Sequence, residues 1–203
     1  MSLFPRELET ERLRLVALDG ETLDSLELYE HVGGDTPGID RLTRHLTWEP
    51  HEHPKETREF LDQCAEQFAA DQGAHYAIYP REGEAGASEL AGLCGLGVDW
   101  DRSLATLGTW LREPFWGRGY SGERARALMS LAFERLDLDC VTVNCDVDNE
   151  NSYRAISKYV ARAGGREEGL LRNHELYPDG PRDVYRFTVT SEEWAEREVA
   201  HDD

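Results

Sequence analysis

The sequence is poor in lysine, in long apolar runs and in paired cysteines, and each shortage excludes a class of protein. Only two of its 22 basic residues are lysines, Lys55 and Lys158. No stretch approaches the ~18 consecutive apolar residues of a membrane-spanning helix, and the start MSLFPRELETERLRL lacks the apolar core of a secretory signal. The four cysteines form no C-x-x-C pair, so neither a disulfide framework nor a zinc site is predicted. We therefore expect a cytoplasmic protein.

Positive charge is also scarce, because 41 acidic residues face 22 basic ones and the formal net charge is −19. Such a surface repels nucleic-acid phosphates and anionic membranes, so neither is an expected partner. The same excess suits a cytoplasm of high salt, where repulsion between like charges is screened. We hypothesise a halophilic source, and an ordinary acidic cytosolic enzyme is the alternative.

One α+β domain is predicted over residues 1–203, because the length fits one domain and no internal repeat or long linker interrupts the chain. Apolar periodicity predicts the following elements. Strands are expected over 13–18, 75–79, 89–98, 104–112, 140–147, 165–173 and 183–189, and helices over 21–31, 39–45, 54–71, 119–136, 151–163 and a last one capped by Ser191.

A glycine-rich turn, PFWGRGYSGE from Pro114 to Glu123, runs directly into the helix predicted over 119–136. The first turn of a helix leaves its backbone N–H groups unpaired, and glycines let a phosphate approach the backbone closely. Arg118 and Arg124 add positive charge beside it. The turn therefore predicts an anion site, and a tight turn without a ligand is the alternative.

The same turn satisfies G-x-G-x-x-G at Gly117, Gly119 and Gly122, the dinucleotide-binding pattern. That pattern requires a strand ending at its first glycine and further β-α units after it. Here three residues separate strand from glycine, and too little chain follows. A P-loop is excluded, because no Gly-Lys-Ser/Thr is present.

The order of elements and the WGRGYSGE turn resemble the Gcn5-related N-acetyltransferase (GNAT) superfamily, and most closely its ribosomal-protein N-terminal acetyltransferase (RimJ/RimL) branch. The resemblance implies a mixed, mostly antiparallel sheet of six to seven strands with helices on both faces. It implies acetyl-CoA as cosubstrate, with its pyrophosphate bound by backbone amides of the turn. The residues that would bind it are Arg118, Gly119, Tyr120, Ser121 and Gly122.

Two later segments extend the resemblance, which spans roughly residues 13–189. Asn149 and Ser152 match an Asn-x-x-Ser element of the branch, and the resemblance implies that Asn149 binds the pantetheine arm. From the residues alone, Asn149 or Asn151 caps a helix. The run GLLRNHE that ends at Glu175, followed by residues 179–185, resembles the final hairpin of the branch.

Acetylation of an amine by a thioester needs a base, a polarised carbonyl and a protonated leaving thiolate. The resemblance places the carbonyl-polarising N–H near Leu107 or Gly108, on a splayed fourth strand. It implies Ser152 as the acid and Glu175 as the base, although a solvated surface acid is the alternative for Glu175. Asp99, Asp101 and His174 are reserve bases.

The sequence departs from the family pattern near these residues. Ile156 stands where the superfamily usually has a tyrosine acid, and Thr106 where the branch often has glutamate. The run YVARAGG, residues 159–165, replaces the usual Gly-Phe after the helix. These departures concern the catalytic residues rather than the cosubstrate.

The resemblance also places the acceptor groove at residues 33–53, including Trp48, with Tyr79 nearby. A core aromatic that anchors the loop is the alternative for Trp48. His51 and His53 have no third ligand close in sequence, so no metal is predicted.

Taken together, the sequence predicts an acetyl-CoA-dependent N-acetyltransferase in which a primary amine attacks the thioester directly. The expected acceptor is a protein N-terminal α-amine. The same transfer onto a small amine (an aminoglycoside, a polyamine or an amino acid) and a catalytically silent acyl-CoA-binding module are the alternatives. A homodimer is compatible with the family resemblance.

The halophilic hypothesis predicts that salt stabilises the fold. Because screening weakens repulsion among the 41 acids, the thermal unfolding midpoint should rise as KCl is raised to molar concentrations. A series of melting curves followed by circular dichroism measures this. A midpoint that stays constant or falls would contradict the hypothesis.

Overall fold

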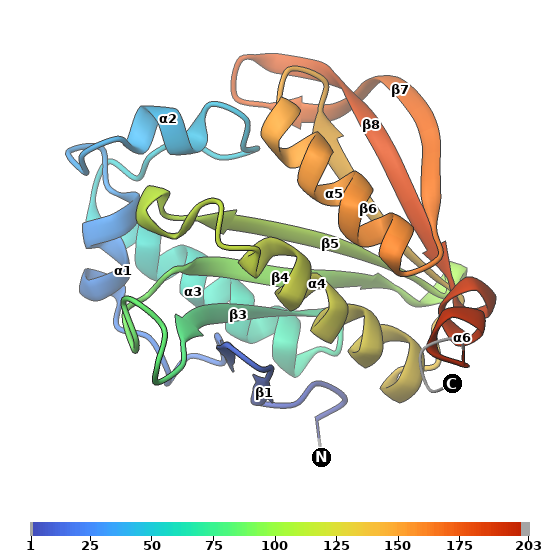
Figure 1. The fold of residues 1–203 in the computed structure, drawn as a ribbon. Helices are drawn as coiled ribbons and strands as arrows, with labels where there is room; N and C mark the ends of the chain where they lie inside the picture. The colour runs from blue at the N-terminus through green and yellow to red at the C-terminus, as the bar shows by residue number, and fades with distance from the viewer. Residues whose placement is uncertain (1, 200–203) are drawn as a thin grey trace. The chain divides into compact units, whose positions relative to one another are not determined.

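The computed structural model describes residues 2–199 (Figure 1). The chain divides into two compact units. The first comprises the chain up to Gly95 together with Thr109–Tyr120, and the second comprises Leu96–Gly108 and the chain from Ser121 on. Two strands, β4 (Gly92–Asp99) and β5 (Leu104–Leu111), contribute residues to both units.

Eight strands pair in the order β1-β2-β3-β4-β5-β6-β8-β7. The pairs β1–β2, β2–β3, β6–β8 and β7–β8 are antiparallel, whereas β5 and β6 are parallel. The predicted α+β fold with a mixed, mostly antiparallel sheet is therefore confirmed, but the expected six to seven strands are too few. The sequence gives no signal for β1 (Glu7–Glu9), because three residues cannot show an alternating pattern.

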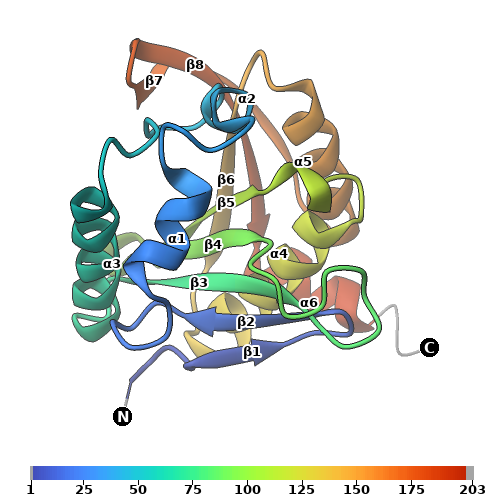
Figure 2. The same cartoon turned by 90° about the vertical axis from the view of Figure 1, so that its left-hand side faces the viewer.

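The first unit places its helices beside the antiparallel strands β2 (Leu13–Ala17) and β3 (Gly73–Pro80). Its helices are α1 (Ser25–Val32), α2 (Ile39–Thr43) and α3 (Pro54–Ala69). Helices α1 and α3 lie side by side, and α3 packs against β3 (Figure 2). The apolar residues of this core are Leu18, Leu28, Val32, Leu61, Cys64, Ala77, Leu90 and Leu93.

Helix α1 begins later than the sequence pattern indicates. The predicted start at residue 21 is wrong, because the carboxylate of Asp24 accepts hydrogen bonds from the backbone N–H groups of Leu26 and Glu27. This N-cap satisfies two of the unpaired amides at the helix start and fixes the first helical residue at Ser25.

The second unit is built around β6 (Cys140–Asp146), which lies between β5 and β8 (Gly180–Thr190). Strand β7 (Arg166–Tyr177) pairs with the far side of β8, and α5 (Glu150–Arg162) lies along β6 and β8 (Figure 1). Helix α4 (Tyr120–Ser130) ends in a π-helical turn, Leu131–Arg135. The helix predicted over 119–136 is therefore present from Tyr120 to Arg135, with its last turn π-helical rather than α-helical.

The hairpin β7–β8 is longer than the sequence predicts. Its strands continue to Tyr177 and from Gly180, whereas the prediction stopped at residue 173 and resumed at 183. The pairing of β7 with β8 is irregular between Leu171 and Glu175, and Asn173 there has a positive φ of 52°. An irregular strand does not show the regular alternation by which a strand is predicted from sequence. The longer hairpin places Glu175 opposite Arg182.

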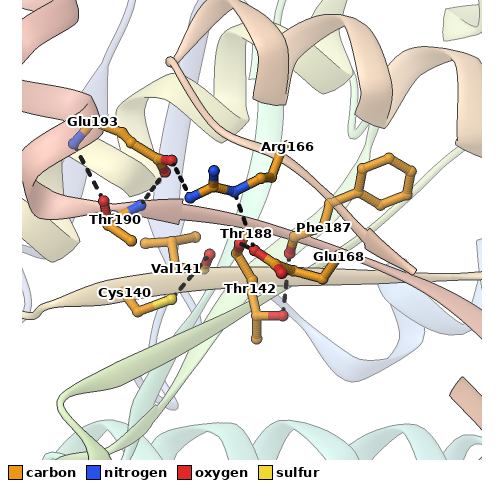
Figure 3. A network of polar contacts seen from close by, with 9 residues as sticks. All are labelled: Cys140, Val141, Thr142, Arg166, Glu168, Phe187, Thr188, Thr190 and Glu193. Atoms are coloured by element: carbon orange, nitrogen blue, oxygen red, sulfur yellow. Dashed lines mark hydrogen bonds and ion pairs between the residues drawn. The ribbon is translucent and has the colours of Figure 1, made fainter. Parts of the chain in front are cut away.

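Helix α6 (Ser191–Val199) begins with a reciprocal cap that involves a different residue from the predicted Ser191. The backbone N–H of Thr190 donates to the Glu193 carboxylate at 3.0 Å, and the N–H of Glu193 donates to the Thr190 hydroxyl at 3.2 Å. Glu193 also pairs with Arg166 of β7 at 2.7 Å, so the cap ties α6 to the hairpin (Figure 3).

Candidate functional site

The glycine turn adopts the conformation that an anion site requires. Gly117 and Gly119 have φ values of +74° and +82°, in the left-handed region that glycine enters without steric cost. Helix α4 begins at Tyr120, directly after the second glycine. Left-handed residues next to a helix start turn successive N–H groups into a concave surface, and the helix dipole adds positive potential there. Backbone geometry at this turn suits phosphate.

The side chains of the turn are occupied elsewhere, within the first unit. Arg118 donates to the carbonyl of Ala85 at 2.6 Å and stacks on Phe115 at 4.9 Å. The fully buried Tyr120 donates its hydroxyl to Glu84 at 2.6 Å, and burial followed by this bond raises the pKa of Tyr120. Arg118 and Tyr120 therefore present backbone N–H groups at the turn, while their side chains hold it in place.

The loop at residues 81–88 supports the turn, and the sequence analysis did not identify this role. This loop supplies both Ala85 and Glu84 as partners. Arg12 is far from the turn in the sequence, and its side chain donates to the carbonyl of Arg118 at 3.0 Å. No sequence signal links these segments to the turn, because their contacts depend on the fold.

In the second unit, β5 and β6 pair over only three residues of each strand. The register runs from Leu104 with Cys140 to Thr106 with Thr142. The pairing of β5 with β6 ends there, although Leu107 and Gly108 continue β5. No described atom lies within 4 Å of where a Cβ on Gly108 would be. The two residues predicted to polarise the acetyl carbonyl thus lie just past the point where the parallel pairing stops.

Asn149 caps α5, as one reading of its motif predicts. Its side-chain oxygen accepts the backbone N–H of Ser152 at 3.1 Å. This bond uses Oδ1 and leaves the NH₂ of the same amide to bind other groups. Ser152 is half-buried in the first turn of α5. The spacing of Asn149 and Ser152 is therefore explained by the helix cap. The role of Asn149 in binding the pantetheine arm stays a prediction.

Glu175 belongs to a polar cluster at the end of β6 rather than to an isolated surface. It is half-buried, and the Nδ2 of Asn144 on β6 donates to its Oε2 at 3.4 Å. Two residues further along β6, the buried Asp146 accepts from Arg182 at 2.6 Å. Arg182 also lies over the Tyr177 ring at 4.4 Å, and burial raises the pKa of Tyr177 to about 12.

The reserve bases are placed less favourably. Asp99 accepts the backbone N–H of Arg102 at 3.1 Å and so caps a short 3₁₀ turn. Asp101 and His174 are exposed. Ile156 is buried in α5 and offers no proton.

Trp48, proposed for the acceptor groove, packs against the core of the first unit. Its ring lies edge-on to Trp110 at 5.9 Å. Tyr79 also packs against this core, with Arg14 5.4 Å from its ring centroid. These contacts favour the anchoring role for Trp48.

The histidines of the same loop bind neighbouring residues. His51 shares a hydrogen bond with Thr57 at 2.8 Å, and His53 lies 3.7 Å from Glu56. Within residues 2–199, no group of three or more His, Cys, Asp or Glu side chains could hold a metal ion. None of the helices described combines the length and apolar character needed to cross a membrane.

Comparison with known families gives a clear assignment. Residues 12–160, which include the glycine turn and α5, match the acetyltransferase (GNAT) domain family. The chain belongs to this family. The resemblance drawn from the glycine turn is thereby confirmed, the protein is an acetyltransferase, and acetyl-CoA is the acyl donor that GNAT acetyltransferases use.

Relatives and solved structures agree with the assignment. The chain is 25% identical over 189 residues to the uncharacterised N-acetyltransferase p20 of Bacillus licheniformis, covering 93% of this chain and 98% of that one. It is 34% identical over 116 residues to YdaF of Bacillus subtilis (strain 168), provisionally named a ribosomal N-acetyltransferase, covering 55% and 61%. RimL, a ribosomal L7/L12 α-N-protein acetyltransferase, shares the fold with a TM-score of 0.72, 22% identity and 89% and 91% coverage.

The left-handed turn predicts a measurable cost for any side chain at Gly119. An L-residue in this conformation costs about 1–2 kcal/mol, so in Gly119→Ala the turn should relax away from the phosphate-binding shape. We expect coenzyme A to bind about tenfold more weakly, measured by titration calorimetry. Gly97→Ala is the control, because a Cβ there meets no atom within 4 Å and the residue is exposed. Equal affinity in both variants would contradict the role of the turn.

Proposed function

We propose that the protein transfers acetyl from acetyl-CoA to a protein N-terminal α-amine, which attacks the thioester directly. The observation that carries the proposal is the pair of left-handed glycines leading into α4, in a chain of the GNAT family. The provisional name of YdaF as a ribosomal N-acetyltransferase supports a protein acceptor. An α-amine, with a pKa of about 8, is also partly neutral at physiological pH, whereas a lysine amine near 10.4 is not.

The donor end of the site is assigned to backbone groups. The N–H groups of Arg118, Gly119, Tyr120, Ser121 and Gly122 would bind the pyrophosphate, which needs several donors and tolerates no Cβ at the closest approach. The Asn149 amide NH₂ would hold the pantetheine arm. The turn fits coenzyme A for two reasons. The first backbone N–H groups of a helix have no partner within the helix, and Gly117 and Gly119 beside them have the conformation that a phosphate site requires.

The transfer step needs three groups, and the second unit supplies a candidate for each. A backbone N–H near Leu107 or Gly108 would stabilise the oxygen of the tetrahedral intermediate. Glu175, held by Asn144, would take the proton from the attacking amine. Ser152, in the first turn of α5, would deliver a proton to the leaving sulfur.

Release of free thiol from acetyl-CoA tests the proposed function. With the purified protein, we expect turnover with a peptide bearing a free N-terminus and none with the same peptide N-terminally acetylated. Turnover with small amines alone, such as a polyamine or an aminoglycoside, would reject the protein acceptor. Binding of coenzyme A without any turnover would show an acyl-CoA-binding module instead.

The role of Glu175 predicts a change in the pH dependence of the rate. A carboxylate must be ionised to take a proton, so protonation of Glu175 should contribute to the fall of the wild-type rate on the acid side. Glu175→Gln should lower the rate and flatten that limb of the pH profile, measured by steady-state kinetics. Glu196→Gln, at an exposed acid of α6, should leave the profile unchanged. An unaltered profile in Glu175→Gln would rule out the assignment.

A further inference from the structure

An arginine from the first strands lies against the glycine turn. Arg12 donates its Nη1–H to the carbonyl of Arg118 at 3.0 Å. Its Nη2 lies 3.4 Å from where a Cβ on Gly119 would be, and its Cζ lies 5.3 Å from the centre of the Tyr120 ring. All four residues belong to the first unit. Three consecutive residues of the turn therefore contact one guanidinium group.

The backbone around Arg12 is fixed by hydrogen bonds on both sides. Arg12 is half-buried and directly precedes β2. Its carbonyl accepts the backbone N–H of Arg81, the first residue of the loop 81–88, at 2.8 Å. The next residue, Leu13, donates its N–H to the hydroxyl of Thr10 at 2.9 Å. The guanidinium therefore reaches the turn from a backbone that is held in place.

The cations expected beside the turn from the sequence, Arg118 and Arg124, direct their side chains elsewhere. Arg118 donates to the carbonyl of Ala85, and Arg124 donates to the carbonyl of Gly108. Arg12 instead donates to the backbone of the turn itself. A hydrogen bond from a charged donor is about twice as strong as one between neutral groups. This contact is therefore well suited to fix the orientation of one peptide unit.

The bond to Arg12 orients the peptide unit between Arg118 and Gly119. This peptide is trans, so its C=O and N–H groups point in opposite directions. Because the C=O points to Arg12, the N–H of Gly119 points away from Arg12. Among residues 2–199, no acceptor bonds this N–H. A ligand on that side of the turn can therefore accept a hydrogen bond from it.

Glycine alone would not hold this orientation. Gly119 has a φ of +82°, and glycine adopts positive and negative φ about equally readily. Rotation of the peptide plane therefore meets little steric resistance at Gly119. The rotated form would direct the carbonyl of Arg118, an acceptor with partial negative charge, toward the side where the N–H now points. An acceptor at that place repels phosphate, so this one peptide decides whether the turn binds an anion.

We propose that Arg12 is a positioning residue for coenzyme A, which holds the Arg118–Gly119 peptide with the N–H of Gly119 facing the pyrophosphate. This inference rests on the proposed function. Arg12 acts through the backbone of the turn, since its Nη1 lies on the carbonyl side of the peptide and the N–H lies on the other. The glycines permit the left-handed shape, and Arg12 selects the peptide orientation that binds phosphate.

Titration calorimetry with coenzyme A and with dephospho-coenzyme A tests the inference. Arg12→Met keeps a long side chain but removes the donors, so coenzyme A should bind about tenfold more weakly or worse. Dephospho-coenzyme A lacks the 3′-phosphate and keeps the pyrophosphate, so its affinity should fall by the same factor. A loss confined to coenzyme A would assign Arg12 to the 3′-phosphate and overturn the proposal.

Steady-state kinetics separates positioning of the turn from general damage to the fold. In Arg12→Met the KM for acetyl-CoA should rise about tenfold while kcat at saturation stays unchanged, because the turn binds substrate and transition state alike. Arg12→Lys retains a charged donor on a long stem and should recover part of the lost affinity. A fall in kcat that Arg12→Lys does not reverse would show a structural role only.

A double-mutant cycle with Gly119→Ala separates positioning from direct contact with phosphate. If Arg12 acts through the Gly119 peptide, the double variant should bind coenzyme A at most about twofold more weakly than the weaker single variant. Independent contributions would multiply to about a hundredfold loss. A multiplicative loss would contradict the positioning role.

Arg14→Met is the matched control. Arg14 lies two residues further along, in β2, and its guanidinium also lies over an aromatic ring, that of Tyr79 at 5.4 Å. The substitution removes the same positive charge from a chain of net charge −19 and leaves the contacts of Arg12 with the turn intact. Its affinity for coenzyme A should equal that of the wild type. Equal losses in Arg14→Met and Arg12→Met would show a general effect of charge and overturn the proposal.

The outcomes distinguish this inference from the proposed function. If the wild type binds neither coenzyme A nor dephospho-coenzyme A, the proposed function fails. If it binds both, and Arg12→Met binds both as tightly, the positioning role is overturned while the proposed function stands. Melting curves followed by circular dichroism check the fold of each variant. If Arg12→Met does not fold, Arg12→Gln, which keeps a neutral donor, takes its place with a loss of affinity expected in the same two titrations.

Discussion

Strands β5 and β6 lie parallel and share three residue pairs, the last of which joins Thr106 to Thr142. On its other side, β6 continues to pair with β8 as far as Asp146. Backbone groups of β5 beyond Thr106 are thus released from β6 while β6 stays fixed by β8. Just beyond this point, the second unit carries Leu107 and Gly108, whose carbonyl accepts a hydrogen bond from Arg124. The polar cluster around Glu175 lies in the same unit. The candidate transfer chemistry depends on this early end of the pairing.

The scarcity of positive charge makes each buried arginine informative. Arg182 has two acidic partners, Asp146 at 2.6 Å and Asp179 at 2.8 Å, so its charge is balanced and it serves the hairpin. Arg124 is more deeply buried, donates to the carbonyl of Gly108 at 3.3 Å and lies 5.8 Å from the centre of the Tyr159 ring. In a chain of net charge −19, a carboxylate for it would be easy to supply. Among the described residues, the partners of Arg124 are neutral groups, whereas those of Arg182 are acidic.

Local signals in the sequence were sufficient for most of the fold. Helix α3 begins at Pro54, and β6 coincides with an alternating β-branched run, because both follow from spacing and residue type. The errors occur where a side chain from elsewhere sets the boundary. Thr190 rather than Ser191 caps α6 through Glu193, and the bulged register of β7 lengthens a hairpin whose sequence looks interrupted.

The sequence by itself determined the family and the position of the glycine turn before α4, because glycine spacing and the start of a helix are local properties of consecutive residues. It also indicated a helix cap at Asn149 or Asn151, and the structure shows that Asn149 is the cap. Only the tertiary structure decided which distant side chains meet. Arg124 and Tyr159 are 35 positions apart and carry no shared motif, yet the guanidinium of Arg124 lies 5.8 Å from the centre of the Tyr159 ring. Hydrogen-bond satisfaction is a property of the packed chain, so it becomes visible only once the helices and strands are in place.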